Sequence, residues 1–340
     1  MSDNGAVRAP NIFDVARLAG VSHQTVSRVL NGLPNVRPAT RERVERAILQ
    51  LKYSPSPQAR ALVTKRTRTL GLIIPSVPDH GPNVIAMHFN IAARAARYRV
   101  DMVSAVGDDP RSVRSTVEAL LGQRVDGIVL VVMDNGVLEM VRSLELGVPV
   151  VAAASTQRRS PILVSIDQYR GARLAVRHLV ELGHTRILHM MGPTGATDSI
   201  ERVRGWRDEL AEWRLSAPEP LVGDWTADSG YQLGKEVELE PGSAVFASND
   251  LMAMGLMSAL RERGLSVPND VSVVGFDDVP EAAYLYPPLT TIRQDFAALG
   301  ELMMQKILIA LEEHEPTTPD TPLPTRLVIR DSTSKRVEPS

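Results

Sequence analysis

The sequence has 340 residues, which is long enough for two or three domains, and its apolar content is ordinary for a folded chain. It contains no cysteine, which excludes disulfides, thiolate metal ligands and a cysteine nucleophile, and which fits a reducing compartment. The net charge of −2 is unevenly distributed: residues 1–66 carry 11 of the 38 Lys and Arg but 4 of the 40 Asp and Glu, which leaves 27 and 36 for the remainder. The basic first part favours a polyanionic partner such as nucleic acid.

Three short helices are expected at the start of the chain. Apolar residues recur at helical spacing from Ile12 to Ala19, and Gly20 permits a sharp turn after them. Ser22 is a suitable N-cap for a second helix from His23 to Leu30. A third helix is expected over about Pro38 to Leu51, with proline at its start and one apolar face.

The second of these helices has the composition of a DNA-reading helix. In a helix-turn-helix unit the second helix lies in the major groove, and the residues at its start meet base edges. Gln can bond adenine through two atoms, Arg can bond guanine, and Ser or Thr can hold phosphates. The residues expected to do this are Ser22, His23, Gln24, Thr25, Ser27 and Arg28. The alternative is an ordinary surface helix in a small bundle, which the turn and the basic charge disfavour.

Residues 52–68 predict a linker with an unusual feature. The segment holds two prolines and five Lys or Arg, yet Ala59, Leu62 and Val63 follow a short apolar helical pattern within it. A plain solvated linker would rarely carry these three residues.

From Thr69 onward, apolar strands alternate with amphipathic helices, which indicates parallel sheets built from βαβ units. The expected strands are Leu70–Ile74, Met102–Val106, Gly127–Val132, Pro149–Ala153, Leu163–Ile166, Ile187–Met191, Ala244–Ala247, Val271–Gly275, Leu289–Ile292 and Leu327–Ile329. So many strands suit two doubly wound subdomains better than one. We therefore expect an all-α helix-turn-helix head, an α/β core of two doubly wound subdomains, and a disordered polar tail over residues 332–340.

Polar residues at strand ends predict a ligand site in this core, because ligands of open α/β domains lie beyond the carboxyl ends of the strands. Asn249 and Asp277 each follow a strand, Trp225 follows the short run Pro220–Asp224, and Arg202 lies near the start of a helix. Arg and Asp can each bond two neighbouring hydroxyls of a sugar, and Trp can pack on its ring face. Each residue alone could be a core, cap or surface residue, so the prediction rests on the set.

Several long motifs, in this order, resemble the lactose-repressor (LacI/GalR) family. They are IFDVARLAGVSHQTVSRVLNG, VRPATRERVERAILQLKYSP, LVELGHTRILHMMGP, GDWTADSGYQ, ASNDLMAMG, VSVVGFDD and YPPLTTIRQDF. The resemblance covers nearly the whole chain and implies a core like that of the periplasmic sugar-binding proteins. The implied parts are a head over residues 1–56, a hinge helix over 57–68, and a core over 69–331 with an N-subdomain (about 69–166 and 296–325) and a C-subdomain (about 167–295).

The resemblance also implies roles for residues in the head and hinge. His23, Gln24 and Arg28 match base-reading positions, and Ser22 and Asn31 match phosphate contacts. In the family a hinge helix folds on the operator and pushes a leucine into the minor groove, which would bend the duplex. The matching leucine here is Leu62, with Ala59 beside it. Because a well-known member has tyrosine at the position of His23, we expect a different operator sequence.

In the core, the positions that match effector contacts of the family are Arg202, Trp225, Asn249, Asp277 and Phe296, with Gln294 and Leu299 less central. Val131 and Ala154 stand where a well-known member has asparagine and aspartate, so we expect a sugar effector that need not be the galactoside bound by that member. His80 and Pro82 fall on the expected lip of the cleft, where His80 could restore one polar contact.

The expected function is a repressor that a small sugar releases from operator DNA. A corepressor-dependent regulator of the same family, and a non-catalytic sugar-binding transport protein, are the alternatives. No catalytic residue, cofactor or metal is expected, because no phosphate loop, nucleophile elbow or HExxH motif occurs. Asp277 and Asp278 should point different ways. We interpret His178, His184 and His189 as structural.

A homodimer is expected because helix-turn-helix heads read palindromic operators in pairs, and because C-terminal leucine heptads that would make a tetramer are lacking. The first residues, MSDNGAVRAPNIFD, have no apolar run of the kind a secretory leader needs, and no run is long enough to span a bilayer. We therefore expect a cytoplasmic protein without a membrane partner.

Overall fold

The computed structural model describes residues 10–30, 34–53, 66–76, 80–105, 110–143, 145–155, 162–240, 242–313 and 321–336. The chain divides into two compact units, Met1–Thr67 and Arg68–Ser340. In the part of the chain that the structure describes, no helix combines the length and the apolar character needed to cross a membrane.

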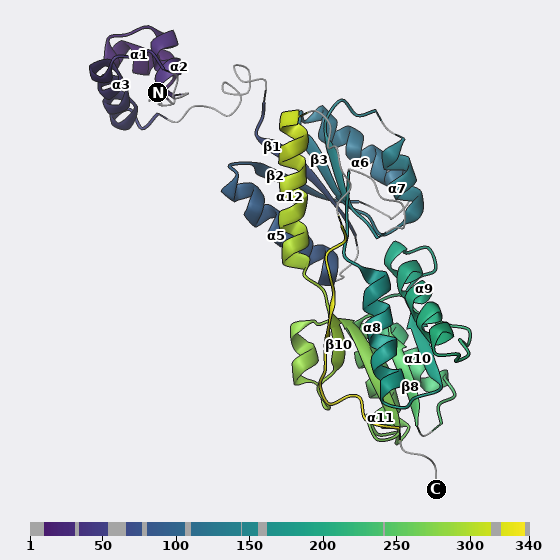
Figure 1. Ribbon diagram of the computed structural model, residues 1–340. Coiled ribbons are helices and arrows are strands. Elements are labelled where there is room, and N and C mark those ends of the chain that lie inside the picture. The colour runs from purple at the N-terminus through teal and green to yellow at the C-terminus, as the bar shows by residue number, and fades with distance from the viewer. Residues whose placement is uncertain are drawn as a thin grey trace, which may run out of the picture. The chain divides into compact units, whose positions relative to one another are not determined.

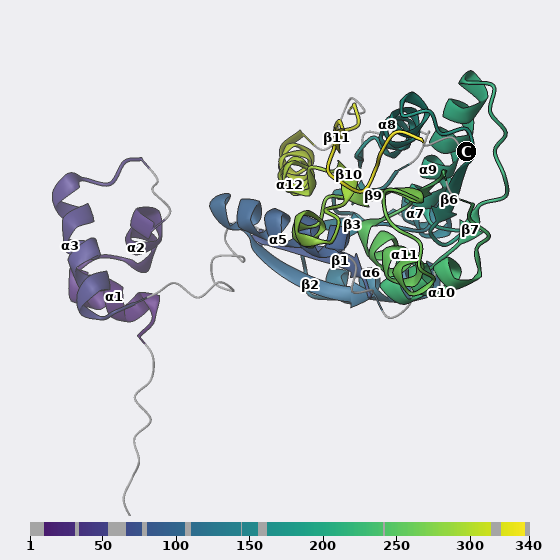
Figure 2. The same cartoon turned by 90° about the horizontal axis from the view of Figure 1, so that it is seen from below.

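The first unit is a bundle of the three predicted helices, α1 (Ile12–Ala19), α2 (His23–Leu30) and α3 (Pro38–Gln50) (Figure 2). Asn11 and Asp14 cap the start of α1 reciprocally, and Gly20 ends it with a φ of 64°, which favours glycine. Their apolar faces meet in a small core of Val15, Ala16, Ala19, Val26, Val29, Val44 and Ala47. The buried faces of α1 and α2 therefore fix the angle at which the start of α2 is presented.

The second unit contains two sheets, of which the first is fully parallel with the strand order β2-β1-β3-β4-β5. Its strands are β1 (Thr69–Pro75), β2 (Arg99–Ala105), β3 (Gly127–Val131), β4 (Val150–Ala153) and β5 (Leu163–Val164). One face is covered by α5 (His80–Ala95) and α12 (Phe296–Glu313), and the other by α6 (Pro110–Gly122) and α7 (Asn135–Arg142) (Figure 1). The first sheet thus borrows a helix from near the end of the chain.

The second sheet has the order β11-β10-β9-β8-β6-β7, with β11 as an antiparallel edge. Its strands are β6 (Ile187–Met191), β7 (Leu221–Val222), β8 (Ser243–Ala247), β9 (Val271–Asp277), β10 (Thr290–Arg293) and β11 (Arg326–Val328). Its helices are α8 (Gln168–Glu181) and α9 (Thr197–Glu212) on one face, α10 (Ala227–Glu236) and α11 (Asp250–Glu262) on the other, and the short 3-10 helix η1 (Pro280–Tyr284). Both sheets are doubly wound, as the alternation of strands and helices predicted.

The chain crosses between the two sheets three times, after β5, between β10 and α12, and before β11. Two of these crossings are paired to each other. Asp167 N donates to Leu323 O at 2.9 Å, and Leu323 N donates to Ser165 O at 2.8 Å. The two halves of the core are therefore joined by adjacent segments, as a hinge between subdomains requires.

The polar segment after β11 is not the disordered tail that its composition predicted, as far as residue 336. Ser332 is fully buried; its Oγ donates to Val273 O at 2.6 Å and accepts from Thr290 N at 2.8 Å. Its carbonyl accepts from Val273 N at 2.8 Å. The prediction was wrong because a polar segment with no apolar period can be held by backbone hydrogen bonds, which composition does not report. Residues 337–340 lie outside the described part of the chain.

Candidate functional site

The start of α2 presents the predicted DNA-reading side chains. Ser22, His23, Gln24 and Arg28 are exposed, while Val26 is buried in the core of the head. Thr25 and Ser27, the other two predicted residues, are half-buried on the same helix. Three exposed polar side chains on α2, and that of Ser22 just before it, are thus available together, which is the arrangement that groove reading requires.

Local contacts hold this helix start in place. Ser22 Oγ accepts from Thr25 N at 3.2 Å, so Ser22 caps α2 as its sequence position predicted. The His23 ring lies 5.1 Å from the ring of Phe13 on α1. The remaining predicted DNA contacts, Asn31, Ala59 and Leu62, lie outside the described residues.

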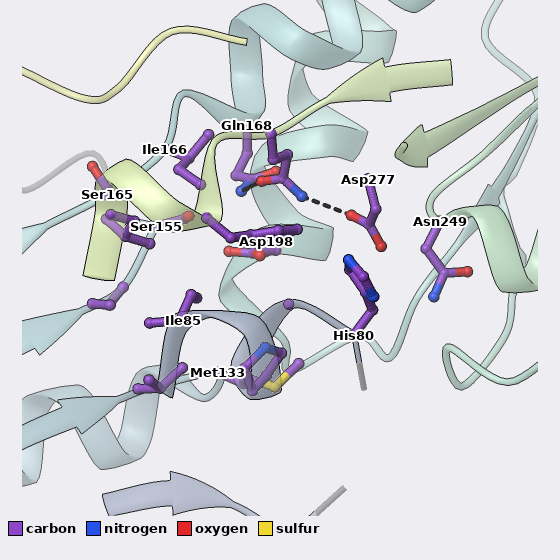
Figure 3. A pocket seen from close by; sticks show the side chains of 18 of the residues that line it. His80, Ile85, Met133, Ser155, Ser165, Ile166, Gln168, Asp198, Asn249 and Asp277 are labelled. Atoms are coloured by element: carbon purple, nitrogen blue, oxygen red, sulfur yellow. Dashed lines mark hydrogen bonds between the residues drawn. The ribbon is translucent and has the colours of Figure 1, made fainter. Parts of the chain in front are cut away.

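A cleft of about 710 Å³, its mouth included, lies between the two subdomains of the second unit (Figure 3). All seven predicted effector residues line it: His80, Arg202, Trp225, Asn249, Asp277, Gln294 and Phe296. The structure therefore brings together residues that the sequence spreads over more than half of the chain.

Arg202, on α9, is the centre of the polar side of the cleft. Its side chain is 4% exposed and donates from Nε to Gln168 Oε1 at 2.9 Å and from a terminal nitrogen to Ser248 O. Its other terminal nitrogen lies 3.4 Å from Asp198 and 3.9 Å from Asp277. A buried guanidinium with this many partners is held in one orientation, which suits bidentate recognition of a polar ligand.

Asp277 and Asp278 form a strained turn at the end of β9, with φ values of 117° and 57°. The Asp277 carboxylate faces the cleft and accepts from Gln294 Nε2 at 2.7 Å (Figure 3). The Asp278 carboxylate is buried and bound by Arg293 and by Arg330. The two carboxylates thus have separate partners, in agreement with the interpretation that they are not an acid–base pair.

A third carboxylate stabilises this turn from beneath. Asp250, the first residue of α11, is fully buried and accepts from Val279 N at 2.9 Å and from Thr291 Oγ1 at 2.5 Å. Burial raises its pKa well above the usual range, and the neighbouring Asp277 carboxylate raises it further. Gly275 leaves room for it, since a Cβ there would lie 2.2 Å from Asp250 Oδ1.

Trp225 and Asn249 are fixed to each other. Asn249 caps α11 with its side-chain oxygen and donates from Nδ2 to Trp225 O at 2.9 Å. Trp225 has a φ of 75° and a ring that packs on Gly192, where a Cβ would lie 2.4 Å from the ring. The Arg202 guanidinium lies 5.4 Å from the Trp225 ring centre and 4.0 Å from that of Phe276. The aromatic surface of the cleft is therefore rigid and set against a cation.

The opposite wall comes from the first sheet and its helices and is mainly apolar. Val131 and Ala154 line it at the ends of β3 and β4, as the departures from the family had suggested. Phe296, at the start of α12, meets the His80 ring edge-on at 5.8 Å. Burial lowers the pKa of His80, and the negative charge of Glu281 opposes this shift.

The sequence reasoning missed several lining residues, of which Gln168 and Asp198 bond Arg202 directly. Both stand in the first turn of a helix, where a polar residue usually faces water, so no signal in the sequence separates them from a surface residue. Ser155 and Ser165, next to strand ends, also line the cleft. Their positions at the carboxyl edge of the first sheet could have pointed to them.

Three histidines that we interpreted as structural are buried and hydrogen-bonded. His184 contacts Gly242 O and Ser272 Oγ, and His178 contacts Thr333 Oγ1. His189 is fully buried, and burial lowers its pKa to about 3. Among the described residues, no three metal-ligating side chains gather in one place.

His189 also supports the cleft from below. Because its Nδ1 lies 2.9 Å from Phe246 O and a carbonyl can only accept, the proton is on Nδ1. Its Nε2 can then accept from Ser248 Oγ at 3.4 Å, and the Ser248 carbonyl receives a hydrogen bond from Arg202. The neutral imidazole of His189 therefore contacts Ser248, the residue whose carbonyl accepts a hydrogen bond from Arg202.

Both units match known families. Residues 11–56 match the model of the bacterial regulatory proteins of the lacI family, and residues 176–333 match a periplasmic binding protein-like domain. The lactose operon repressor of Escherichia coli K12 is 34% identical over 328 residues, which cover 95% of this chain and 90% of that protein.

Solved structures of regulators resemble the chain over nearly its whole length. A lac repressor dimer bound to operator and the anti-inducer ONPF matches with a TM-score of 0.87 and 32% identity, covering 96% of this chain and 100% of the other. A complex of the transcriptional regulator CelR with cellobiose matches with a TM-score of 0.68 and 31% identity, covering 95% and 99%. Since this likeness extends over the reading helix, both sheets and the cleft between them, the chain belongs to the lacI family of bacterial regulatory proteins.

Proposed function

We propose that this protein is a homodimeric transcriptional repressor that binds a palindromic operator and releases it when a small sugar occupies the cleft. The observation that carries the proposal is the gathering of Arg202, Asp277, Asn249 and Trp225 in one cleft of a lacI-family chain. Charged and amide groups with several donors and acceptors fit vicinal hydroxyls, and an indole fits a sugar ring face. That CelR was solved with cellobiose supports a sugar as the ligand class.

The proposed DNA contacts lie at and just before the start of α2 and in the linker: Ser22, His23, Gln24, Thr25, Ser27, Arg28, Asn31, Ala59 and Leu62. A regulator that reads chromosomal DNA works in the cytoplasm, and we propose no catalytic step. Two identical heads reading one palindrome account for the dimer. The lac repressor match is itself a dimer on operator DNA, which supports this assembly.

The experiment that tests the proposal starts from two unbiased screens. Selection from a random DNA pool should return a palindromic sequence, and a thermal-shift panel of mono- and disaccharides, cellobiose and galactosides included, should return at least one stabilising sugar. Titrating that sugar into the complex with the selected DNA should weaken binding. By linkage, the DNA should weaken sugar binding by the same factor.

Each failure has a distinct meaning. Tighter DNA binding with the sugar would favour the corepressor alternative, and selection without a palindrome would contradict the reading role of α2. Arg28→Ala should weaken binding to the selected DNA far more than binding to random DNA, because it removes a base-edge contact. An equal loss on both DNAs would restrict Arg28 to phosphate contact.

A further inference from the structure

Four polar side chains form a closed ring at the place where the chain crosses between the subdomains. Arg202 Nε donates to Gln168 Oε1 at 2.9 Å, Gln168 Nε2 donates to Gln294 Oε1 at 2.6 Å, and Gln294 Nε2 donates to Asp277 Oδ1 at 2.7 Å. Asp277 Oδ1 lies 3.9 Å from an Arg202 nitrogen and closes the ring. These four residues, Arg202, Gln168, Gln294 and Asp277, are called the pivot ring below.

The two glutamines occupy equivalent places at two crossings. Gln168 is the first residue of α8, directly after the crossing from the first sheet to the second. Gln294 stands between β10 and α12, directly before the crossing back. Each crossing also ends in a helix capped by an aspartate, Asp167 for α8 and Asp295 for α12. The hydrogen bond between the two glutamines therefore ties together segments that run between the subdomains in opposite directions.

The direction of every hydrogen bond in the pivot ring is fixed by its charged members. A guanidinium can only donate, so Gln168 must accept through its oxygen and donate through its nitrogen. A carboxylate can only accept, so Gln294 must present its nitrogen to Asp277 and its oxygen to Gln168. Arg202, Gln168 and Gln294 are all less than 10% exposed, so water cannot readily replace a lost partner.

We propose that the pivot ring, whose four members all belong to the subdomain of the second sheet, fixes the two crossings at the points where they meet that subdomain and so biases the angle between the subdomains, and that Gln168 and Gln294 are positioning residues through which the cleft acts on the hinge. Arg202 and Asp277 line the cleft, so a ligand that binds either of them changes the strength of the Arg202–Gln168 and Gln294–Asp277 hydrogen bonds. The glutamines in turn join the two crossings. The control by a ligand rests on the proposed function, whereas the effect on the angle does not.

The absence of cysteine in the sequence makes the angle directly measurable. Cysteines introduced at two exposed positions, Glu118 on α6 and Arg261 on α11, take nitroxide labels on opposite subdomains. Double electron–electron resonance then gives the distance distribution in the full chain without DNA or sugar. Labelled protein is diluted into excess unlabelled protein, so that distances between protomers do not contribute.

The most specific variant, Gln168→Glu, replaces one side-chain nitrogen by an oxygen. In Gln168→Glu the carboxylate can still accept from Arg202, but its second oxygen faces the oxygen of Gln294. If Gln294 turns over to donate to Glu, its oxygen faces Asp277 instead. The pivot ring therefore cannot be satisfied, and we expect the single distance of the parent to give way to a broader or second population.

The rescue variant reverses the two hydrogen bonds of Gln294. In Gln168→Glu combined with Asp277→Asn, Gln294 turns over, donates to the new carboxylate and accepts from the new amide, so both of its hydrogen bonds are restored while the negative charge beside Arg202 moves from residue 277 to residue 168. We expect the parent distribution to return. The control is Asp198→Asn, which alters another partner of Arg202, 3.4 Å away, outside the ring, and should leave the distribution unchanged.

Circular dichroism and thermal melting establish that each variant is folded. A parent-like distribution in Gln168→Glu would overturn the proposal, and so would a double variant that stays as broad as the single one. If the proposed sugar regulation failed instead, these distributions would be unaffected, because no sugar is present. The two ideas can therefore fail separately.

Discussion

The wall of the cleft formed by the second sheet carries charged and amide side chains, whereas the wall formed by the first sheet carries mainly aliphatic ones. The polar wall is also the strained one, with positive φ values at Trp225, Asp277 and Asp278. Strain of this kind persists only where the surrounding contacts determine it, and here Asp250 and the pivot ring do so. The comparison indicates that one wall offers polar groups held in a fixed network, while the other offers apolar contact.

The largest expected effect is that of Arg202→Ala on the polar wall. It leaves Gln168 Oε1 and Ser248 O without their donor and removes the cation beside Asp277, so the free energy of unfolding should fall by about 3–5 kcal/mol. Urea denaturation measures this change. The matched variant on the apolar wall, Ile85→Val, should cost about 0.5–1.5 kcal/mol. Equal losses in the free energy of unfolding of the two variants would contradict the expectation that the polar wall contributes more to stability than the apolar wall.

A second prediction concerns the support beneath the polar wall. His189 has a pKa of about 3 in the folded chain, below the value near 6.5 of an unfolded histidine. Its contribution to stability is therefore complete above pH 6.5 and is lost as the pH falls from 6.5 toward 3, by about 1.4 kcal/mol per pH unit. His189→Asn keeps a donor for Phe246 O but cannot be protonated.

Urea denaturation at pH 7, 6 and 5 separates packing from protonation. Loss of the ring should lower the stability of His189→Asn at every pH, but its stability should fall less steeply with acid than that of the parent. If the free energy of unfolding falls with pH equally steeply in the parent and in His189→Asn, a group other than His189 causes the loss of stability in acid.

A third prediction tests how rigid the aromatic surface is. In Gly192→Ala the new methyl would lie 2.4 Å from the Trp225 ring, so the ring must move, at a cost of about 1–3 kcal/mol and with weaker sugar binding. The matched control is Gly122→Ala at the end of α6, where a Cβ meets nothing within 4 Å. It should be neutral or stabilise by up to about 1 kcal/mol. If the two variants have the same melting temperature, the Trp225 ring is not constrained by its contact with Gly192.

The smallest expected effect comes from making the apolar wall polar. Val131→Asn places an amide where the cleft now has two methyl groups, and one new hydrogen bond to a hydroxyl would favour more polar sugars by about tenfold, or 1.4 kcal/mol. Calorimetry against the sugar panel measures the change. Val131→Thr, which is shorter, serves as the control. An unchanged order of preference would show that ligands do not reach this wall through their hydroxyl groups.

The sequence predicted the alternating α/β core and the gathering of the strand-end residues, because buried parallel strands and the edge at which they end leave a strong local pattern. Asn249 and Asp277 could be found in this way. Gln168 could not, because its role depends on Gln294, which is 126 residues away in the sequence. The fixed segment at Ser332 was missed for the same reason, since its partners Val273 and Thr290 are distant along the chain.

The placement of α12 has a consequence for synthesis of the chain. β5 ends at Val164, but α12, the second of the two helices that cover one face of its sheet, begins only at Phe296. Ribosomes add about 5–20 residues per second, so this face waits on the order of ten seconds for its second helix. During that interval the apolar side chains of the first sheet that later pack against α12, Leu72 and Val129 among them, lack that partner. The nascent chain therefore exposes apolar surface, of the kind that makes folding intermediates prone to aggregate, until α12 is made.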